Sequence, residues 1–169
     1  MCGIAGMLSK DIDLRERRTL IKNISDSLKM RGPDGYGDFT KPYVSLIHRR
    51  LAVIDPERGA QPMTFGKYTI VYNGEIYNTE EIRNELTAAG YSFDTHCDTE
   101  VILKAYHLWK EESCKKLNGI FAYAVWDDEA KELFLCRDRI GVKPLYFTQK
   151  DGIFAFASRI KSLLLIPEV

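Results

Sequence analysis

The chain has 169 residues, of which 45 % are hydrophobic and 28 % are charged, as in a globular protein rather than a disordered or membrane-spanning one. No apolar run approaches the roughly 18 residues that a bilayer span needs, and the length predicts one domain over residues 1–169. The 24 basic residues balance the 24 acidic ones, so no overall positive field would attract nucleic acid, and neither nucleic acid nor a membrane is an expected partner.

Apolar patterning in the first half of the chain predicts strands around one helix. A short apolar stretch with two glycines predicts a strand at 2–9, and apolar residues on one face predict a helix at 13–29. The R-G-P-D-G segment at 31–35 breaks that helix and predicts a loop. Further strands are predicted at 43–48, 51–54 and 68–72.

The second half of the chain predicts helices followed by hairpins. A helix is expected at 79–89, with Asn78 as its N-cap, Glu81 completing a capping box and Gly90 ending it. Another helix is expected to start near Asp98 or Thr99. Strands are expected at 120–126 and 133–136, then a hairpin with strands at 146–147 and 153–157, and a last helix after residue 158. Strands that are apolar on both faces must be covered twice, which predicts a layered mixed fold without fixing its topology.

The four cysteines form no C-x-x-C pair, so their spacing indicates neither a zinc site nor a redox pair. The amino terminus has no secretory signal, and we therefore expect the reducing cytoplasm. Cys97, Cys114 and Cys136 are expected to be small, buried hydrophobic residues.

Cys2 is the most informative residue, because removal of Met1 would leave it with both a thiol and a free α-amine. Those groups have ordinary pKa values of about 8.5 and 7.7–8.0, so one residue would supply a nucleophile and a base suited to neutral pH. Taken alone, a cysteine at position two is weak evidence, and an unremarkable residue in a first strand is the simpler interpretation.

Polar groups elsewhere would suit an amide hydrolase. A guanidinium from Arg49 or Arg50 would bind a carboxylate, and Asn73 with Gly74 offers the usual donors of an oxyanion hole. Glu75 and Asp98 could hold an ammonium group. Each also has a simpler interpretation: the arginines as surface ion pairs, Asn73–Gly74 as a β-turn, and Asp98 as a helix N-cap.

Several motifs together resemble the glutaminase domain of glutamine-hydrolysing asparagine synthetases, a class II glutamine amidotransferase. The motifs are C-G-I-A-G at 2–6, R-G-P-D-G at 31–35, H-R-R-L at 48–51, N-G-E-I-Y-N at 73–78, D-T-E at 98–100, R-D-R-I-G-V-K-P-L-Y at 137–146 and F-A-S at 156–158. They span nearly the whole chain in the family's order. The resemblance implies an α+β fold, the four-layer αββα N-terminal-nucleophile sandwich of two antiparallel sheets.

The resemblance also implies a site for L-glutamine. Cys2 would be the nucleophile, with its own α-amine as the proton carrier. Asn73 and Gly74 would form the oxyanion hole. Arg50, rather than Arg49, would bind the α-carboxylate, and Glu75 with Asp98 would hold the α-ammonium.

No cofactor and no metal are expected in this domain. ATP and magnesium would belong to a synthetase domain, in cis or as a partner subunit, of which the chain contains nothing; its ammonia acceptor cannot be read from this half. Two departures from the family pattern are Cys97, where relatives often carry Ser or Gly, and Arg159, which replaces an acid. Two other functions remain open: an N-terminal-cysteine hydrolase of other amides, and a non-enzymatic interaction domain.

Overall fold

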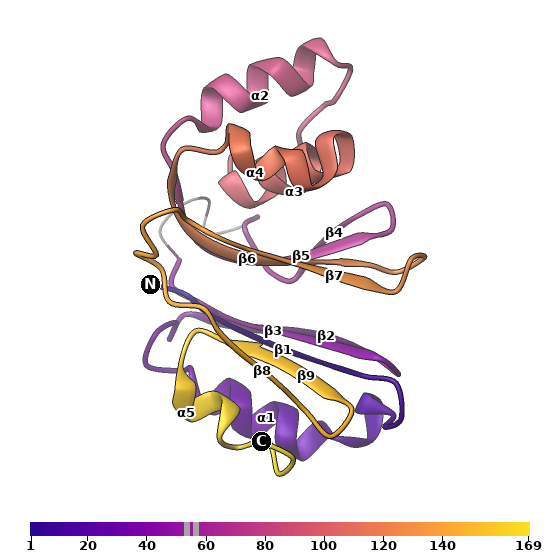
Figure 1. Ribbon diagram of the computed structural model, residues 1–169. Coiled ribbons are helices and arrows are strands. Elements are labelled where there is room, and N and C mark those ends of the chain that lie inside the picture. The colour runs from indigo at the N-terminus through magenta and orange to yellow at the C-terminus, as the bar shows by residue number, and fades with distance from the viewer. Residues whose placement is uncertain (53–54, 56–57) are drawn as a thin grey trace.

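The computed structural model describes residues 1–52, 55 and 58–169 of the protein and has four layers. Two sheets face one another in the middle, with α2, α3 and α4 on the outside of one sheet and α1 and α5 on the outside of the other (Figure 1). All strand pairs are antiparallel. The predicted α+β sandwich of two antiparallel sheets between helical layers is therefore confirmed.

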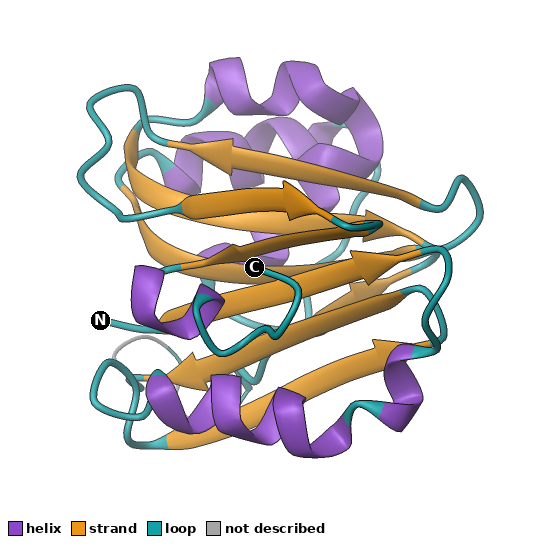
Figure 2. Ribbon diagram, turned by 60° about the horizontal axis from the view of Figure 1, so that its bottom comes forward, coloured by secondary structure: helices purple, strands orange, loops and turns teal. Residues whose placement is uncertain are grey.

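The first sheet has five strands in the order β2-β3-β1-β9-β8. Their bounds are β1 Gly3–Ser9, β2 Gly35–Lys41, β3 Val44–Arg50, β8 Tyr146–Lys150 and β9 Ile153–Ala157. β1 lies between β3 and β9, and the register pairs Gly3 with Arg49. Since β1 and β3 are antiparallel, the beginning of the chain lies beside the end of β3. Figure 2 shows the outer face of this sheet, covered by helices.

The second sheet has four strands in the order β4-β5-β6-β7. Their bounds are β4 Met63–Phe65, β5 Tyr68–Ile76, β6 Gly119–Asp127 and β7 Glu132–Arg137. Ile4 and Leu46 of the first sheet form one core cluster with Val71 and Trp126 of the second. Because its members come from both sheets, this cluster lies between them. The central strands are apolar on both faces, so each must be covered on both sides.

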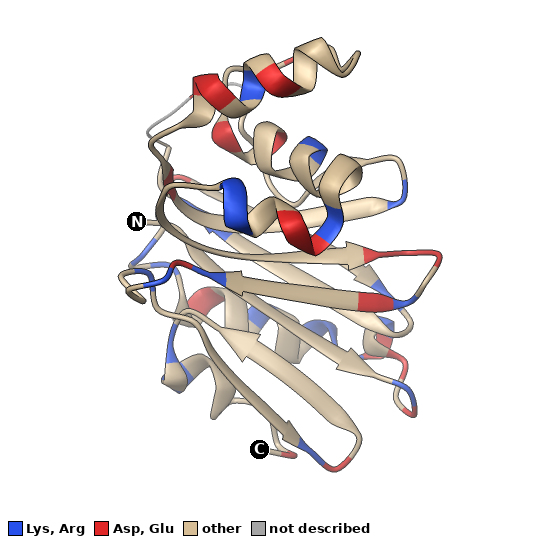
Figure 3. Ribbon diagram, turned by 45° about the horizontal axis from the view of Figure 1, so that its top comes forward, with Lys and Arg blue, Asp and Glu red and all other residues tan. Residues whose placement is uncertain are grey.

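The helices bury the outer faces of the sheets. Their bounds are α1 Arg18–Ser27, α2 Thr79–Ala88, α3 Asp98–Trp109, α4 Ser113–Lys116 and α5 Ile160–Leu163, with 3-10 turns at Leu14–Glu16 and Lys110–Glu112. The apolar face predicted for the first helix is buried, with Ile21 and Ile24 at 4 % and 2 % exposure. None of the helices in the described part of the chain is long and apolar enough to cross a membrane. Figure 3 shows acidic and basic residues near one another on the helices, in loops and at strand ends, while most of each strand carries neither.

Several predicted boundaries need correction. The strand predicted at 51–54 is not present at Leu51 and Ala52, and its other two residues lie outside the described part of the chain. β2 and β4 were not predicted, because alternating glycines in one and a length of three residues in the other give little periodic signal. The predicted helix at 13–29 is a 3-10 turn followed by α1.

Asn78 precedes α2 as predicted, but its side chain makes no capping hydrogen bond. It instead accepts from the backbone N–H of Asn118 at 2.9 Å and donates to the carbonyl of Lys116 at 3.0 Å. The cysteine prediction is also only partly right: Cys97 is buried, whereas Cys114 and Cys136 are half-buried.

Candidate active site

A cavity of about 270 Å³ opens where the start of β1, the end of β3 and the second half of β5 meet the first turn of α3. All six residues that the family resemblance assigns to the site line it: Cys2, Arg50, Asn73, Gly74, Glu75 and Asp98. They come from both sheets and from a helix, so the fold gathers residues that are up to 96 positions apart in the sequence.

Cys2 is half-buried and lies immediately before β1. Its Sγ accepts a hydrogen bond from the backbone N–H of Leu51 at 3.4 Å, and the thiol lies 3.6 Å from the Leu51 carbonyl. Arg31 donates from Nε to the Cys2 carbonyl at 3.0 Å. Leu51, which follows β3, thus contacts the thiol, and Arg31, in the loop that follows α1, holds the Cys2 backbone.

Asn73 and Gly74 lie inside β5, paired with β6, and not in a hairpin turn. This excludes the turn interpretation. The Asn73 side chain is 1 % exposed, and its Nδ2 has no hydrogen-bond partner among the described residues. An orphaned buried amide donor is costly, which marks Asn73 as a group prepared for an acceptor that enters the cavity. A Cβ at Gly74 would lie 2.4 Å from the Ile120 carbonyl, so only glycine fits at this position.

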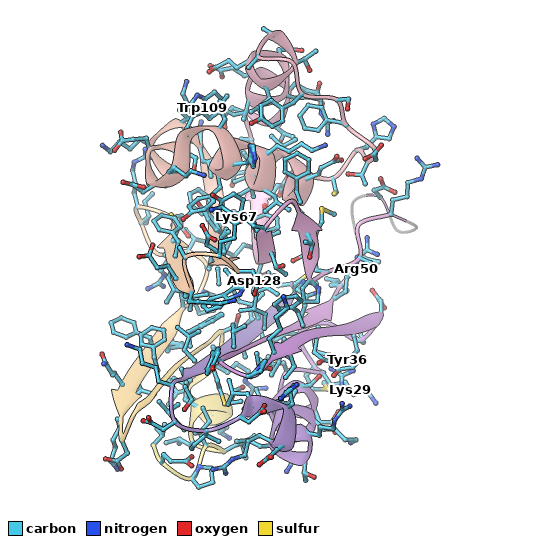
Figure 4. All side chains as sticks on the ribbon, turned by 90° about the vertical axis from the view of Figure 1, so that its right-hand side faces the viewer. Lys29, Tyr36, Arg50, Lys67, Trp109 and Asp128 are labelled. Atoms are coloured by element: carbon cyan, nitrogen blue, oxygen red, sulfur yellow. The ribbon has the colours of Figure 1, made fainter. Side chains whose placement is uncertain are left out.

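The two neighbouring arginines have different environments. Arg49 bonds Ser25 and Asp26 on α1 and lies 5.0 Å from the ring centroid of Tyr36, outside the cavity. The simpler interpretation of the arginines, as members of ion pairs, is therefore confirmed for Arg49. Arg50 lines the cavity and donates from Nη2 to the Asp55 carbonyl at 2.6 Å. Figure 4 shows Arg50 at the end of β3, at the level where the two sheets face one another, and Tyr36 beyond the first sheet.

Asp98 is the first residue of α3, and Cys97 occupies the N-cap position that the alternative interpretation gave to Asp98. The Asp98 side chain reaches into the cavity, where Oδ2 accepts from the Tyr72 hydroxyl at 2.6 Å. Burial raises the pKa of this carboxyl above its ordinary value, although hydrogen bonds from Tyr72 and from backbone N–H groups oppose that rise. Glu75 is exposed at the rim of the same cavity.

The cavity is also lined by residues for which the sequence predicted no role, among them Gln61, Tyr72, Thr99 and Lys143. Gln61 accepts from the backbone N–H of Tyr72 at 2.6 Å and donates to the Thr99 hydroxyl at 3.0 Å, so it ties β5 to α3. Lys143 is 7 % exposed and adds a second cation to the cavity. Lys143 lies in the motif at 137–146. Arg31 lies in the motif at 31–35; it contacts Cys2 but does not line the cavity. Only the folded chain shows what they touch.

His48 lies one residue before the arginine pair, yet it does not line the cavity. It is 1 % exposed, and its Nε2 has no hydrogen-bond partner among the residues that the structure describes. Burial lowers the pKa of His48 to about 4, so its imidazole is neutral near pH 7. His48 therefore belongs to the packing between the layers and leaves the proton chemistry to other groups.

A model of the glutamine amidotransferase domain matches residues 1–169, and the chain belongs to this family. Its curated relatives include asparagine synthetase [glutamine-hydrolyzing] 3 of Bacillus subtilis, 44 % identical over 173 residues, covering 100 % of this chain and 28 % of that protein. Asparagine synthetase [glutamine-hydrolyzing] 1 of the same organism is 42 % identical, over 97 % of this chain and 27 % of that protein. The chain thus spans less than a third of the length of these relatives.

The fold is also similar to solved structures. Glutamine phosphoribosylpyrophosphate amidotransferase from B. subtilis, complexed with ADP and GMP, superposes with a TM-score of 0.81 over 97 % of this chain and 43 % of that one. A structure described as the allosteric regulatory enzyme of purine biosynthesis gives 0.80. Both are 19 % identical in sequence, and they establish the N-terminal-nucleophile fold alone.

Proposed function

We propose that the protein hydrolyses L-glutamine to glutamate and ammonia through a thioester on Cys2. One observation carries the proposal: a single cavity collects a thiol, two cations, two carboxylates and a buried amide donor that has no partner among the described residues. A free amino acid carries a carboxylate and an ammonium on the same carbon, so a cavity with both signs of charge suits it. The side-chain amide of glutamine would then lie against the thiol and the amide donor.

In this proposal, different residues bind the α-carboxylate, the α-ammonium and the side-chain amide of glutamine. Arg50 binds the α-carboxylate, since a guanidinium forks onto two oxygens. Asp98 and Glu75 hold the α-ammonium. Arg49 is engaged with α1 and takes no part. Asn73 and the backbone N–H of Gly74 receive the oxyanion, where charge develops during the reaction.

The reaction has two steps. The α-amine of Cys2 takes the thiol proton, and the sulfur attacks the carboxamide carbon to give a tetrahedral oxyanion. The C–N bond then breaks, and ammonia leaves with the proton from the amine. Water attacks the thioester with the same amine as base, which releases glutamate and restores the thiol. No metal or cofactor enters either step.

This chemistry requires the removal of Met1. With Met1 attached, the nitrogen of Cys2 is an amide and has no basic lone pair. Met1 also lines the cavity, and its Sδ lies 3.1 Å from the Lys143 Nζ. Trimming therefore does two things in this proposal: it frees the base and it opens the cavity.

The ammonia would pass to an ATP-dependent synthetase domain, in cis or as a partner subunit, with ATP and magnesium bound there. Support comes from relatives that are named glutamine-hydrolysing asparagine synthetases and are more than three times as long as the matched segment. Aspartate is the acceptor that those names suggest. The proposed setting is the cytoplasm, and residues 1–169 are proposed to form one glutaminase domain.

The test is glutamate release by trimmed protein, with two cysteine variants compared. Cys2 and Cys97 both line the cavity, but only Cys2 has a role in the proposal. Cys2→Ala should abolish turnover, and Cys97→Ala should keep most of it. If N-acylated glutamine were hydrolysed as fast as glutamine, the proposal would be wrong, because Asp98 and Glu75 would then have no ammonium to hold.

A further inference from the structure

Glu100 completes the D-T-E motif two residues after Asp98, yet it does not line the cavity. Its carboxylate is paired with the Lys104 ammonium one turn later on α3, with Oε1 and Nζ 2.5 Å apart and both side chains buried. Lys104 also donates to the Ser92 carbonyl at 2.6 Å. Taking two charges out of water is costly, and an apolar pair of similar volume is often as stable. The hydrogen bonds that the pair makes to the backbone, rather than the attraction between its charges, therefore indicate what it does.

The Glu100 carboxylate folds the connection between α2 and α3 back onto α3. Its Oε1 accepts from the backbone N–H of Asp94 at 3.0 Å, and its Oε2 accepts from the backbone N–H and the hydroxyl of Thr95 at 2.8 and 2.6 Å. The Thr95 hydroxyl in turn accepts from the N–H of Cys97, the N-cap residue, at 3.3 Å. A glutamate at this position of a helix usually bonds the N-cap N–H itself, whereas Glu100 reaches past the N-cap into the connection. Burial opposes the ionisation of Glu100, but hydrogen bonds from Lys104, Thr95 and the backbone outweigh it and lower its pKa, so the carboxylate is charged near pH 7.

This connection leads to both of the groups proposed to hold the ends of glutamine. Asp98 directly follows Cys97, so the direction in which the connection enters α3 sets the position of the Asp98 carboxylate. The connection also bonds a second segment, because the His96 N–H donates to Asp55 Oδ2 at 3.0 Å. The carbonyl of the same Asp55 accepts from Arg50 Nη2 at 2.6 Å. Two short series of contacts therefore run from the connection, one to the carboxylate and the other to the guanidinium of the cavity.

We propose that Glu100 is a positioning residue of the glutamine site. Its carboxylate, with Lys104 behind it, holds the α2–α3 connection so that Asp98 and Arg50 keep the separation that the α-ammonium and the α-carboxylate of one amino acid require. The inference rests on the proposed function, because it concerns the groups that bind glutamine there. The Cys2 thiol and the oxyanion donors are held by other contacts, from the end of β3, the loop after α1 and the β5–β6 pairing. Loss of the Glu100 carboxylate should therefore weaken glutamine binding more than it slows the chemical step.

The experiment compares variants of the trimmed whole chain by glutamate release and by urea unfolding. Glu100→Gln keeps the shape of the side chain, but its single amide oxygen cannot replace both carboxylate oxygens, and the Lys104 charge is left unpaired. We expect KM to rise about 10-fold, kcat to stay within about threefold and the urea midpoint to fall. The double variant Glu100→Gln/Lys104→Met buries no charge, so it should regain most of the midpoint and keep the raised KM. Glu112→Gln is the matched control, since it breaks an exposed pair with Lys115 and should leave KM within about twofold.

Hydrogen exchange of the backbone amides at 94–96, measured without substrate, is the readout that does not need turnover. Exchange there should be faster in Glu100→Gln than in the wild-type chain and in Glu112→Gln. The inference is overturned by an unchanged KM in Glu100→Gln, by a KM that returns to normal in the double variant, or by unchanged exchange at 94–96. If the trimmed wild-type chain released no glutamate, the proposed function would fail, and the exchange rates would still decide whether Glu100 holds the connection.

Discussion

Replacement of Asn73 by alanine should separate catalysis from folding. The Asn73 side chain is 1 % exposed, and its Nδ2 has no partner among the described residues, so it need break no bond within the protein to donate to an oxyanion. Removing one such donor costs about 2.7–4 kcal/mol in the transition state, so kcat should fall roughly 10²–10³-fold while KM changes little. The loss of an unsatisfied amide offsets the small cavity left by the substitution, and the free energy of unfolding should stay within about 1 kcal/mol.

Asn78→Ala is the matched control for this prediction. Asn78 holds two hydrogen bonds, to Asn118 and Lys116, and lies outside the cavity lining. Its removal should lower the free energy of unfolding by about 1–2 kcal/mol and leave kcat within about twofold. Initial rates of glutamate release and urea unfolding of both variants make the comparison. An Asn73→Ala enzyme with normal kcat, or one that loses stability as Asn78→Ala does, would refute the oxyanion assignment.

Three further predictions concern charge. Arg50→Ala should raise KM for glutamine roughly 10–150-fold with a smaller effect on kcat, since a charged hydrogen bond is worth about 1.5–3 kcal/mol; a KM that did not change would remove Arg50 from the site. For Asp98, KM should rise as pH falls through its raised pKa, and Asp98→Asn should give a high KM without that pH dependence; equal pH profiles would count against its contact with the ammonium. His48 has its pKa lowered from 6.5 to about 4, so the unfolded state binds the proton more tightly, and stability that is complete above pH 6.5 should decline by about 3 kcal/mol toward pH 4. Urea unfolding of His48→Gln should lack that part of the decline.

Much of the site could be predicted because its residues lie in short motifs. Cys2 begins the first apolar stretch, and Arg50 and the 73–75 segment follow later ones. The antiparallel register then brings the start of β1 beside the end of β3. The choice of Arg50 over its neighbour came from the family motif. In the structure Arg50 lines the cavity, whereas Arg49 bonds Ser25 and Asp26 on α1; the role of Arg50 stays a prediction.

The rest depends on contacts between distant residues. No periodicity could reveal that Arg31 would donate to the Cys2 carbonyl, or that Gln61 would join β5 to α3. The capping box predicted for Asn78 is wrong because the Asn78 side chain binds another partner. That partner is the backbone N–H of Asn118, the residue just before β6. Local sequence rules thus located most elements, and tertiary hydrogen bonds decided what the polar side chains do.

The most direct measurement compares ammonia release by two preparations of the same chain, one with Cys2 at the amino terminus and one with Met1 retained, each verified by mass. We predict that release from glutamine tracks the trimmed fraction and that the Met1-retaining preparation is inactive while it unfolds at the same denaturant concentration. Equal turnover by the two preparations would contradict the claim that one terminal residue supplies both the sulfur and the base.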